Sequence, residues 1–181
     1  MGDGIKVFSG LKSCLHILKA LLIPKEMCDA VTDIDCLQLY SNGYRTMIID
    51  LDNTILPVSE VQFSLHYINW IERANAQGFQ IYIVSNNSSY RRVNKACSQI
   101  HVQGLYFAMK PLALSVKDLV RKEYIDLEKT VVIGDQMLTD VALGNWLKTY
   151  TILVDPMDKK LSFIKTLQRE IEVWLLKRLQ S

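Results

Sequence analysis

Short apolar runs alternate with segments of helical periodicity from residue 44 onward, and this alternation restricts the fold more than any other feature. The runs lack strict apolar–polar alternation, so we expect strands that are buried on both faces. Helices between such strands connect them in parallel through right-handed crossovers. The predicted strands are 46–52, 79–85, 104–109, 130–135 and 150–155, and the predicted helices are 62–78, 90–100, 112–124 and 140–147.

These elements predict an α/β fold of three layers, in which helices cover both faces of a doubly wound, mainly parallel sheet of five strands. The chain of 181 residues has a size typical of one domain, and its 49% hydrophobic content is typical of a folded globular protein. We place this domain at residues 25–157. An amphipathic helix is predicted before it, at 1–24, and another that packs on the domain is predicted after it, at 158–181.

Two carboxylates, Asp50 and Asp52, come at the end of the first predicted strand. A buried charge is costly unless it is paired, and a second like charge nearby raises the cost. We therefore expect a cation beside these two side chains, or a chemical role for them.

Polar side chains also come at the ends of the next three predicted strands. Ser85 and Asn86 follow the second strand, Lys110 follows the third, and Asp135 ends the fourth. Any one of these residues could be only the cap of a following helix. Ligands bind beyond the carboxyl ends of the strands in doubly wound folds, so a matching set at four strand ends favours one shared site.

Three carboxylates without a neighbouring histidine or thiol suit a hard cation, and Mg²⁺ is the natural candidate. A lysine and backbone N–H groups after a strand suit a phosphate. Mg²⁺, phosphate and a carboxylate nucleophile together predict phosphoryl transfer through an aspartyl phosphate. The four cysteines form no CxxC pair, so we expect no zinc site and interpret them as free thiols of a reducing compartment.

The motifs at the strand ends resemble those of the haloacid dehalogenase (HAD) superfamily of phosphohydrolases. They are "DLDNT" at 50–54, "VSNN" at 84–87, "KP" at 110–111 and "GDQMLTD" at 134–140. Their order and the "YTILV" that follows are most similar to the YqeG-type branch, class IIIA, whose eukaryotic relatives are phosphatidylglycerophosphate phosphatases. The resemblance extends from about residue 24 to residue 157 and implies a HAD-like fold.

The resemblance implies roles for the residues that match the motifs. Asp50 would be the nucleophile, and Asp52 would be the general acid and base. Ser85 and the N–H group of Asn86 would hold phosphate oxygens. Lys110 would offset charge on the nucleophile and on the transferring phosphoryl group.

The resemblance also implies a Mg²⁺ site. Asp135 would bind the ion together with an oxygen of Asp50 and the backbone carbonyl of Asp52. Asp140 would support the metal from a second layer or cap the following helix. Thr54, near the phosphate subsite, would support the loop geometry or donate a hydrogen bond toward Asp50.

The spacing of the motifs leaves no room for an inserted cap domain. The interval from Asp52 to Ser85 is filled by one helix and one strand, as is the interval from Ser85 to Lys110. An uncovered site suits a phosphate that protrudes from a larger molecule, such as a lipid or a protein. The net charge of +2 argues against a nucleic-acid partner.

The N-terminal segment has the pattern of a helix that lies on an anionic membrane. If residues 5–22 form a helix, one side of it carries an apolar stripe of Phe8, Leu11, Leu15, Leu18 and Leu22. The lysines of this segment lie on the other sides of the helix. The alternative is a helix docked onto the domain or onto a sister subunit in an oligomer. The segment resembles neither a signal peptide nor a membrane span, so we expect a cytoplasmic protein, peripheral on the inner face of the membrane.

These features predict a Mg²⁺-dependent phosphomonoester hydrolase that works through a phospho-aspartate. The resemblance favours phosphatidylglycerophosphate as the substrate and phosphatidylglycerol as the product. One alternative is a phosphatase for a soluble phosphomonoester or a phosphoprotein. Another is a non-catalytic scaffold, although a scaffold would have no reason to keep a repulsive pair of acids.

Overall fold

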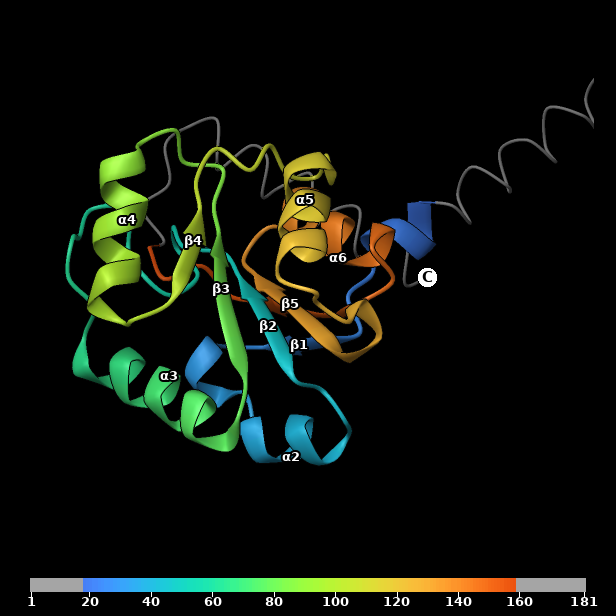
Figure 1. Ribbon diagram of the computed structural model, residues 1–181, viewed down its shortest axis with the longest axis horizontal. Coiled ribbons are helices and arrows are strands. Elements are labelled where there is room, and N and C mark those ends of the chain that lie inside the picture. Colours follow the sequence, from blue (N-terminus) through green and yellow to red (C-terminus); the bar gives the residue numbers. More distant parts are fainter. Residues whose placement is uncertain (1–17, 159–181) are drawn as a thin grey trace, which may run out of the picture.

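Six parallel strands form one sheet in the computed structural model, which describes residues 18–158 (Figure 1). The strand order is β1-β6-β5-β2-β3-β4, and all neighbouring strands run parallel. The strands are β1 (Glu26–Cys28), β2 (Thr46–Ile49), β3 (Gln80–Val84), β4 (Gln103–Leu105), β5 (Thr130–Gly134) and β6 (Tyr150–Val154). The predicted α/β class and parallel sheet are confirmed.

The predicted number of strands, five, is wrong, because β1 adds a sixth strand at the edge of the sheet. β1 is three residues long and pairs with β6, with Glu26 opposite Ile152. Its middle side chain, Met27, is 55% exposed. The segment therefore lacks the apolar run that identifies a buried strand, and only its pairing with β6 reveals it.

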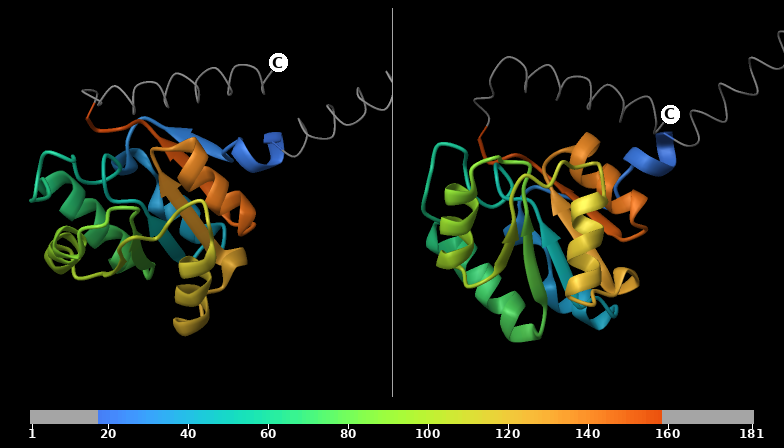
Figure 2. Two further views of the ribbon diagram at one scale, coloured as in Figure 1. Left: turned by 90° about the horizontal axis from the view of Figure 1, so that it is seen from above. Right: turned by 45° about the horizontal axis from the view of Figure 1, so that its top comes forward.

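Helices pack on both faces of the sheet, as Figure 2 shows from two further directions. The helices are η1 (Val31–Asp33), α2 (Cys36–Ser41), α3 (Leu65–Gln77), α4 (Tyr90–Gln99), α5 (Leu114–Lys122), η2 (Leu127–Lys129), the π-helical turn η3 (Met137–Val141) and α6 (Ala142–Trp146). Helix α3 ends as predicted at Gly78, whose φ of 99° is a left-handed conformation that glycine adopts without strain.

The two faces of the sheet belong to separate apolar cores. Met47 and Ile49 of β2 lie in a cluster with side chains of α2, α3 and α4. Ile48, between them, lies in a second cluster with side chains of α5 and α6. Successive side chains of a strand point to opposite faces, so a strand covered on both faces must be apolar at every position. This arrangement explains the unbroken apolar runs of the sequence.

Strand β2 lies where the direction of the chain across the sheet reverses. From β2 the chain passes to β3 and β4 on one side, and it then crosses to β5 and β6 on the other side. The connection from β2 to β3 contains a loop and α3, and the connection from β3 to β4 contains α4. Neither connection holds an inserted domain, so the predicted absence of a cap is confirmed.

The terminal segments fall largely outside the described residues. The structure does not describe residues 1–17, which include most of the predicted membrane-surface helix. It also does not describe residues 159–181, which include nearly all of the predicted C-terminal helix. Residues 18–22 are helical, and Leu22 is buried in a cluster with side chains of η3 and β6. This end of the predicted stripe therefore packs on the domain. Across the described part of the chain, no helix is long and apolar enough to cross a membrane.

Candidate active site

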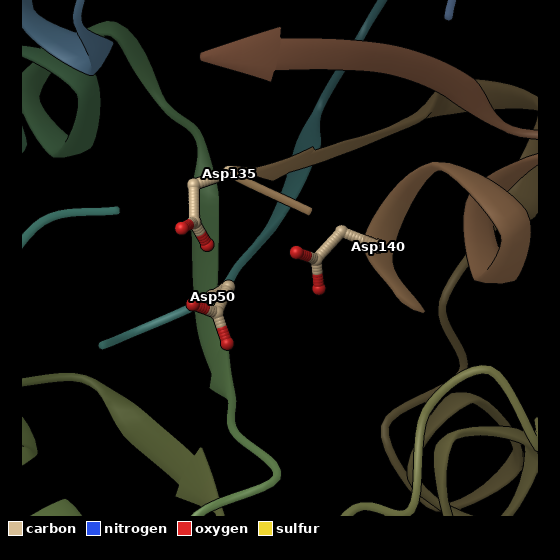
Figure 3. Close-up of side chains that lie close together, drawn as sticks. All are labelled: Asp50, Asp135 and Asp140. Atoms are coloured by element: carbon tan, nitrogen blue, oxygen red, sulfur yellow. The ribbon is translucent and has the colours of Figure 1, made fainter. Parts of the chain in front are cut away.

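Three buried carboxylates converge beyond the carboxyl ends of β2 and β5 (Figure 3). Asp50 follows β2, Asp135 follows β5, and Asp140 projects from η3. One oxygen of each carboxylate lies within 4.8 Å of the others. Gly134 permits this approach, because a Cβ at that position would collide with the carboxyl group of Asp140. A single cation could contact oxygens of all three side chains at this spacing.

Lys110 provides the positive charge of this cluster. Its Nζ lies 2.6 Å from Oδ1 of Asp50 and 2.6 Å from Oδ1 of Asp140, and its side chain is 3% exposed. The side-chain amide of Asn86 holds the lysine backbone in place, since its Oδ1 accepts from the Lys110 N–H at 2.6 Å and its Nδ2 donates to the Lys110 carbonyl at 3.0 Å. The loop after β3 therefore positions the lysine that follows β4.

Thr54 links two of the carboxylates. Its hydroxyl lies 3.0 Å from Oδ2 of Asp50 and 3.3 Å from Oδ1 of Asp135, and its single proton can be donated to one of them at a time. The same oxygen accepts a hydrogen bond from the Asp135 N–H at 3.1 Å. The structure thus places Thr54 between the carboxylates, where it orients Asp50.

The protonation of the cluster reflects its burial and its excess of negative charge. Burial raises the pKa of Asp135 to about 8, and repulsion from Asp50 and Asp140 adds to this effect. Burial also raises the pKa of Asp50 to about 6, although Lys110 acts in the opposite direction. Burial alone would lower the pKa of Lys110, but Asp140 and Asp50 outweigh it and raise that pKa, so the ammonium group stays charged.

A divalent cation would relieve this repulsion, and the residues present fit Mg²⁺. The converging donors are carboxylate oxygens, which are the ligands that Mg²⁺ prefers. Within the described residues this donor set consists of three aspartates, and such a set suits a hard cation. A divalent cation bound there would lower the pKa values of Asp50 and Asp135, because a nearby positive charge favours the ionised carboxylates.

The metal-free protein should lose stability as the pH rises. Because the folded-state pKa of Asp135, about 8, exceeds the ordinary value of 3.8, the folded protein holds a proton that the unfolded chain releases. Asp50 acts in the same direction. The free energy of unfolding in EDTA should therefore fall between about pH 4 and pH 8, by on the order of 5 kcal/mol.

Urea unfolding at several pH values, with EDTA or Mg²⁺, measures this loss. Mg²⁺ should restore most of the stability at the upper end of the range, and Asp135→Asn should flatten the pH dependence in EDTA. Asp118→Asn on the surface of α5 is the matched control. A steep dependence that persists in Asp135→Asn would contradict the assignment of the buried proton to Asp135.

The carboxylate of Asp52 lies outside the cluster of three and has its own partners. Nε and Nη2 of Arg92 each lie 2.7 Å from its Oδ1, and Nδ2 of Asn87 donates to its Oδ2 at 2.7 Å. Arg92 also donates to the carbonyls of Glu60 and Pro57, at 2.6 Å and 2.9 Å. The guanidinium group thus holds the carboxylate of Asp52 and the loop after β2 in one position.

Sequence reasoning did not identify Arg92 or Asn87 as part of this site. One signal was available, because Arg91 and Arg92 stand in the first turn of α4. A helix N-terminus disfavours positive charge, so an arginine there is unfavourable unless a carboxylate compensates it. The amide of Asn87 follows "VSN" directly, but nothing in the sequence indicates which carboxylate it reaches.

Ser85 and Asn86 stand at the carboxyl end of β3, beside the site. Ser85 is buried, and its Oγ accepts a hydrogen bond from the Asn87 N–H at 3.0 Å. The backbone of Asn86 follows at the edge of the crevice, while its side chain is used to hold Lys110. These contacts shape the turn after β3, in which backbone N–H groups suit a phosphate oxygen.

The parallel sheet, its switch point and the buried cluster of acids and lysine define the protein as a HAD-like phosphatase. Comparison with known proteins agrees with this class. The sequence matches the family described as "Mitochondrial PGP phosphatase" over residues 8–157, and the chain belongs to that family. The chain is also 33% identical to "Probable phosphatase YqeG" of Bacillus subtilis (strain 168) over 164 aligned residues. This alignment covers 91% of this chain and 95% of that protein.

A solved structure shares the fold at much lower sequence identity. It is that of an uncharacterized protein from Listeria monocytogenes serotype 4b, with a TM-score of 0.53 and 15% identity. The alignment covers 75% of this chain and 98% of the other. This likeness extends the evidence for the fold beyond close relatives.

Proposed function

We propose that this phosphatase is Mg²⁺-dependent and hydrolyses phosphatidylglycerophosphate through a phospho-aspartate formed on Asp50. The proposal rests on the hydrogen bonds to Asp50. Lys110 Nζ donates to its Oδ1 at 2.6 Å, and the Thr54 hydroxyl donates to its Oδ2 at 3.0 Å. Its pKa of about 6 leaves it mostly ionised at neutral pH. The family to which the chain belongs supports the choice of substrate.

In the first step, an oxygen of the Asp50 carboxylate attacks phosphorus opposite the leaving oxygen. The bond from phosphorus to the leaving oxygen breaks, and Asp52 gives its proton to that oxygen so that it departs as an alcohol. Ser85 and nearby backbone N–H groups hold the other phosphate oxygens. Lys110 offsets the negative charge that Asp50 and the phosphoryl group bring together.

In the second step, Asp52 takes a proton from water, and the resulting hydroxide attacks the phosphorus of the phospho-aspartate. The phosphorus–oxygen bond to Asp50 breaks, which releases phosphate and regenerates the carboxylate. Asp52 is thereby protonated again for the next turnover. Arg92 and Asn87 keep the carboxylate of Asp52 in one orientation for both proton transfers.

Asp50, Asp135 and the backbone carbonyl of Asp52 would hold the Mg²⁺ ion. When bound, the ion supplies positive charge for the phosphoryl oxygens and orients the phosphate. Asp140 contributes through its ion pair with Lys110, which fixes the ammonium group beside Asp50.

The uncovered site favours a phosphate carried by a large molecule, and a lipid at the inner face of a membrane meets this condition. A phosphate-release assay should compare phosphatidylglycerophosphate in mixed micelles with glycerol phosphate, p-nitrophenyl phosphate and a phosphopeptide. We expect the highest kcat/KM for the lipid. A higher value for a soluble ester or for the phosphopeptide would replace the lipid with that substrate class, and no release from any of them would support the scaffold alternative.

Arg92→Lys should lower kcat about tenfold with little change in KM, because it weakens an orientation that is needed only during proton transfer. Lysine keeps the positive charge, but its ammonium group lacks the planar set of N–H donors with which Arg92 binds Asp52 and two backbone carbonyls at once. Steady-state kinetics on p-nitrophenyl phosphate would show this split. Arg91→Lys, one residue away and exposed, is the control. A change confined to KM or to the melting temperature would mean that Arg92 does not position the proton donor.

A further inference from the structure

Large apolar side chains stand exposed on the two segments that lead from the site to α4 and α5. Between 43% and 71% of the surface of each of these residues is accessible. We name this group the apolar rim; it consists of Tyr90, Tyr106, Phe107, Met109, Leu112 and Leu114. Exposed apolar side chains gathered on two neighbouring segments are typical of an interaction surface.

The apolar rim borders the site directly. Lys110, which reaches Asp50, stands between Met109 and Leu112 in the chain, and Tyr90 begins the helix that follows Ser85. Figure 1 shows both segments at the top of the molecule, beyond the carboxyl ends of β3 and β4. A molecule that covers the rim would therefore present its own groups to the site.

The backbone holds the residues of the apolar rim in fixed positions. Phe107 and Met109 have φ values of 47° and 55°, a left-handed conformation that is unfavourable for bulky side chains. The Phe107 N–H donates to the Asn87 carbonyl at 2.9 Å, which joins the two segments. The rings of Tyr90 and Tyr106 pack edge to face, with their centroids 5.3 Å apart. Apolar side chains are thus held outward by a conformation that costs free energy.

The charge of this part of the chain indicates what covers the rim. The sequence contains no acidic residue between Glu72 and Asp118. Arg91 stands beside Tyr90, Lys117 lies one turn after Leu114, and both basic side chains are exposed. Tyrosines, large apolar side chains and basic residues together are typical of surfaces that enter the interface of an anionic bilayer.

We propose that the apolar rim inserts into the surface of an anionic lipid bilayer, with Arg91 and Lys117 against the headgroups, and so brings the site to a phosphate borne by a lipid. The inference deepens the proposed function, since it rests on a lipid substrate. It assigns the membrane contact to the apolar rim with Arg91 and Lys117, separate from the N-terminal segment.

Flotation with vesicles of phosphatidylcholine, with or without phosphatidylglycerol, tests the surface in the full-length protein. Phe107→Asn combined with Leu114→Ser should weaken binding to the anionic vesicles at least about tenfold, because two apolar side chains no longer enter the interface. Asn suits the left-handed conformation at position 107. Lys117→Glu, a second and independent variant, should also weaken binding, and more so at low salt. Leu37→Ser is the control, since Leu37 is 63% exposed on α2, a helix that lies at the opposite end of the molecule in Figure 1.

Measurements of phosphatase activity distinguish the proposed lipid substrate from the proposed docking surface. The rim variant should lose turnover of phosphatidylglycerophosphate in vesicles in parallel with binding, while its turnover of p-nitrophenyl phosphate stays that of the wild type. If the wild type binds vesicles through the rim but does not hydrolyse the lipid, the proposed substrate fails and the docking surface stands. Unchanged vesicle binding in both variants would overturn the docking surface. So would a wild type that ignores anionic vesicles, or a rim variant that changes only the oligomeric state.

Discussion

Asp50→Asn is expected to lower turnover of any phosphomonoester by at least about a thousandfold while leaving the fold intact. The amide has nearly the shape of the carboxylate but cannot attack phosphorus. Lys110 keeps its ion pair with Asp140 in this variant, so the ammonium group is not left without a partner. The substitution also removes one of the buried like charges, which should favour folding in the absence of metal.

Steady-state kinetics and acid quenching of the enzyme with a radiolabelled substrate measure this effect. The wild type should retain label on Asp50, and the variant should retain none. Asp118→Asn, the same substitution on an exposed carboxylate that pairs with Arg121 at 2.8 Å, controls for loss of charge. Activity near the wild-type level in Asp50→Asn would rule out the covalent mechanism.

Lys110→Met should cause the largest loss of stability, about 3–5 kcal/mol in EDTA at neutral pH. The substitution leaves the carboxylates of Asp50 and Asp140 buried without the cation that contacts both of them at 2.6 Å. Because the pKa of Lys110 is raised, the ammonium group is present at all pH values up to its ordinary range, and its contribution is complete at neutral pH. The variant should also be nearly inactive, since charge on the phosphoryl group is no longer offset.

Urea unfolding of the Lys110→Met variant measures the loss, which should shrink at acidic pH as the carboxylates become protonated, and shrink again on addition of Mg²⁺. Lys117→Met, an exposed lysine on α5, should change the free energy of unfolding by less than about 0.5 kcal/mol. An equally small effect at both positions would mean that water or another cation already neutralises the buried acids.

The sequence by itself was enough to predict the class of fold. Apolar runs of strand length and helices of 3.6-residue period are local patterns, so β2, β3, β5 and β6 and the helices α3, α4 and α5 were predictable. Parallel strands then place their carboxyl ends at one edge of the sheet. For this reason the sequence alone places the polar residues at those ends, including Asp50, Lys110 and Asp135, in a common crevice.

Tertiary structure alone decided which side chains in that crevice contact one another. Arg92 reaches Asp52 across 40 residues of sequence, and Asp140 reaches Lys110 across 30. Strand β1 exists as a strand only because β6 lies beside it. Such contacts depend on strand order, on register and on the direction in which each turn leaves the sheet. These properties come from the packing of the whole domain, and no local periodicity of the sequence encodes them.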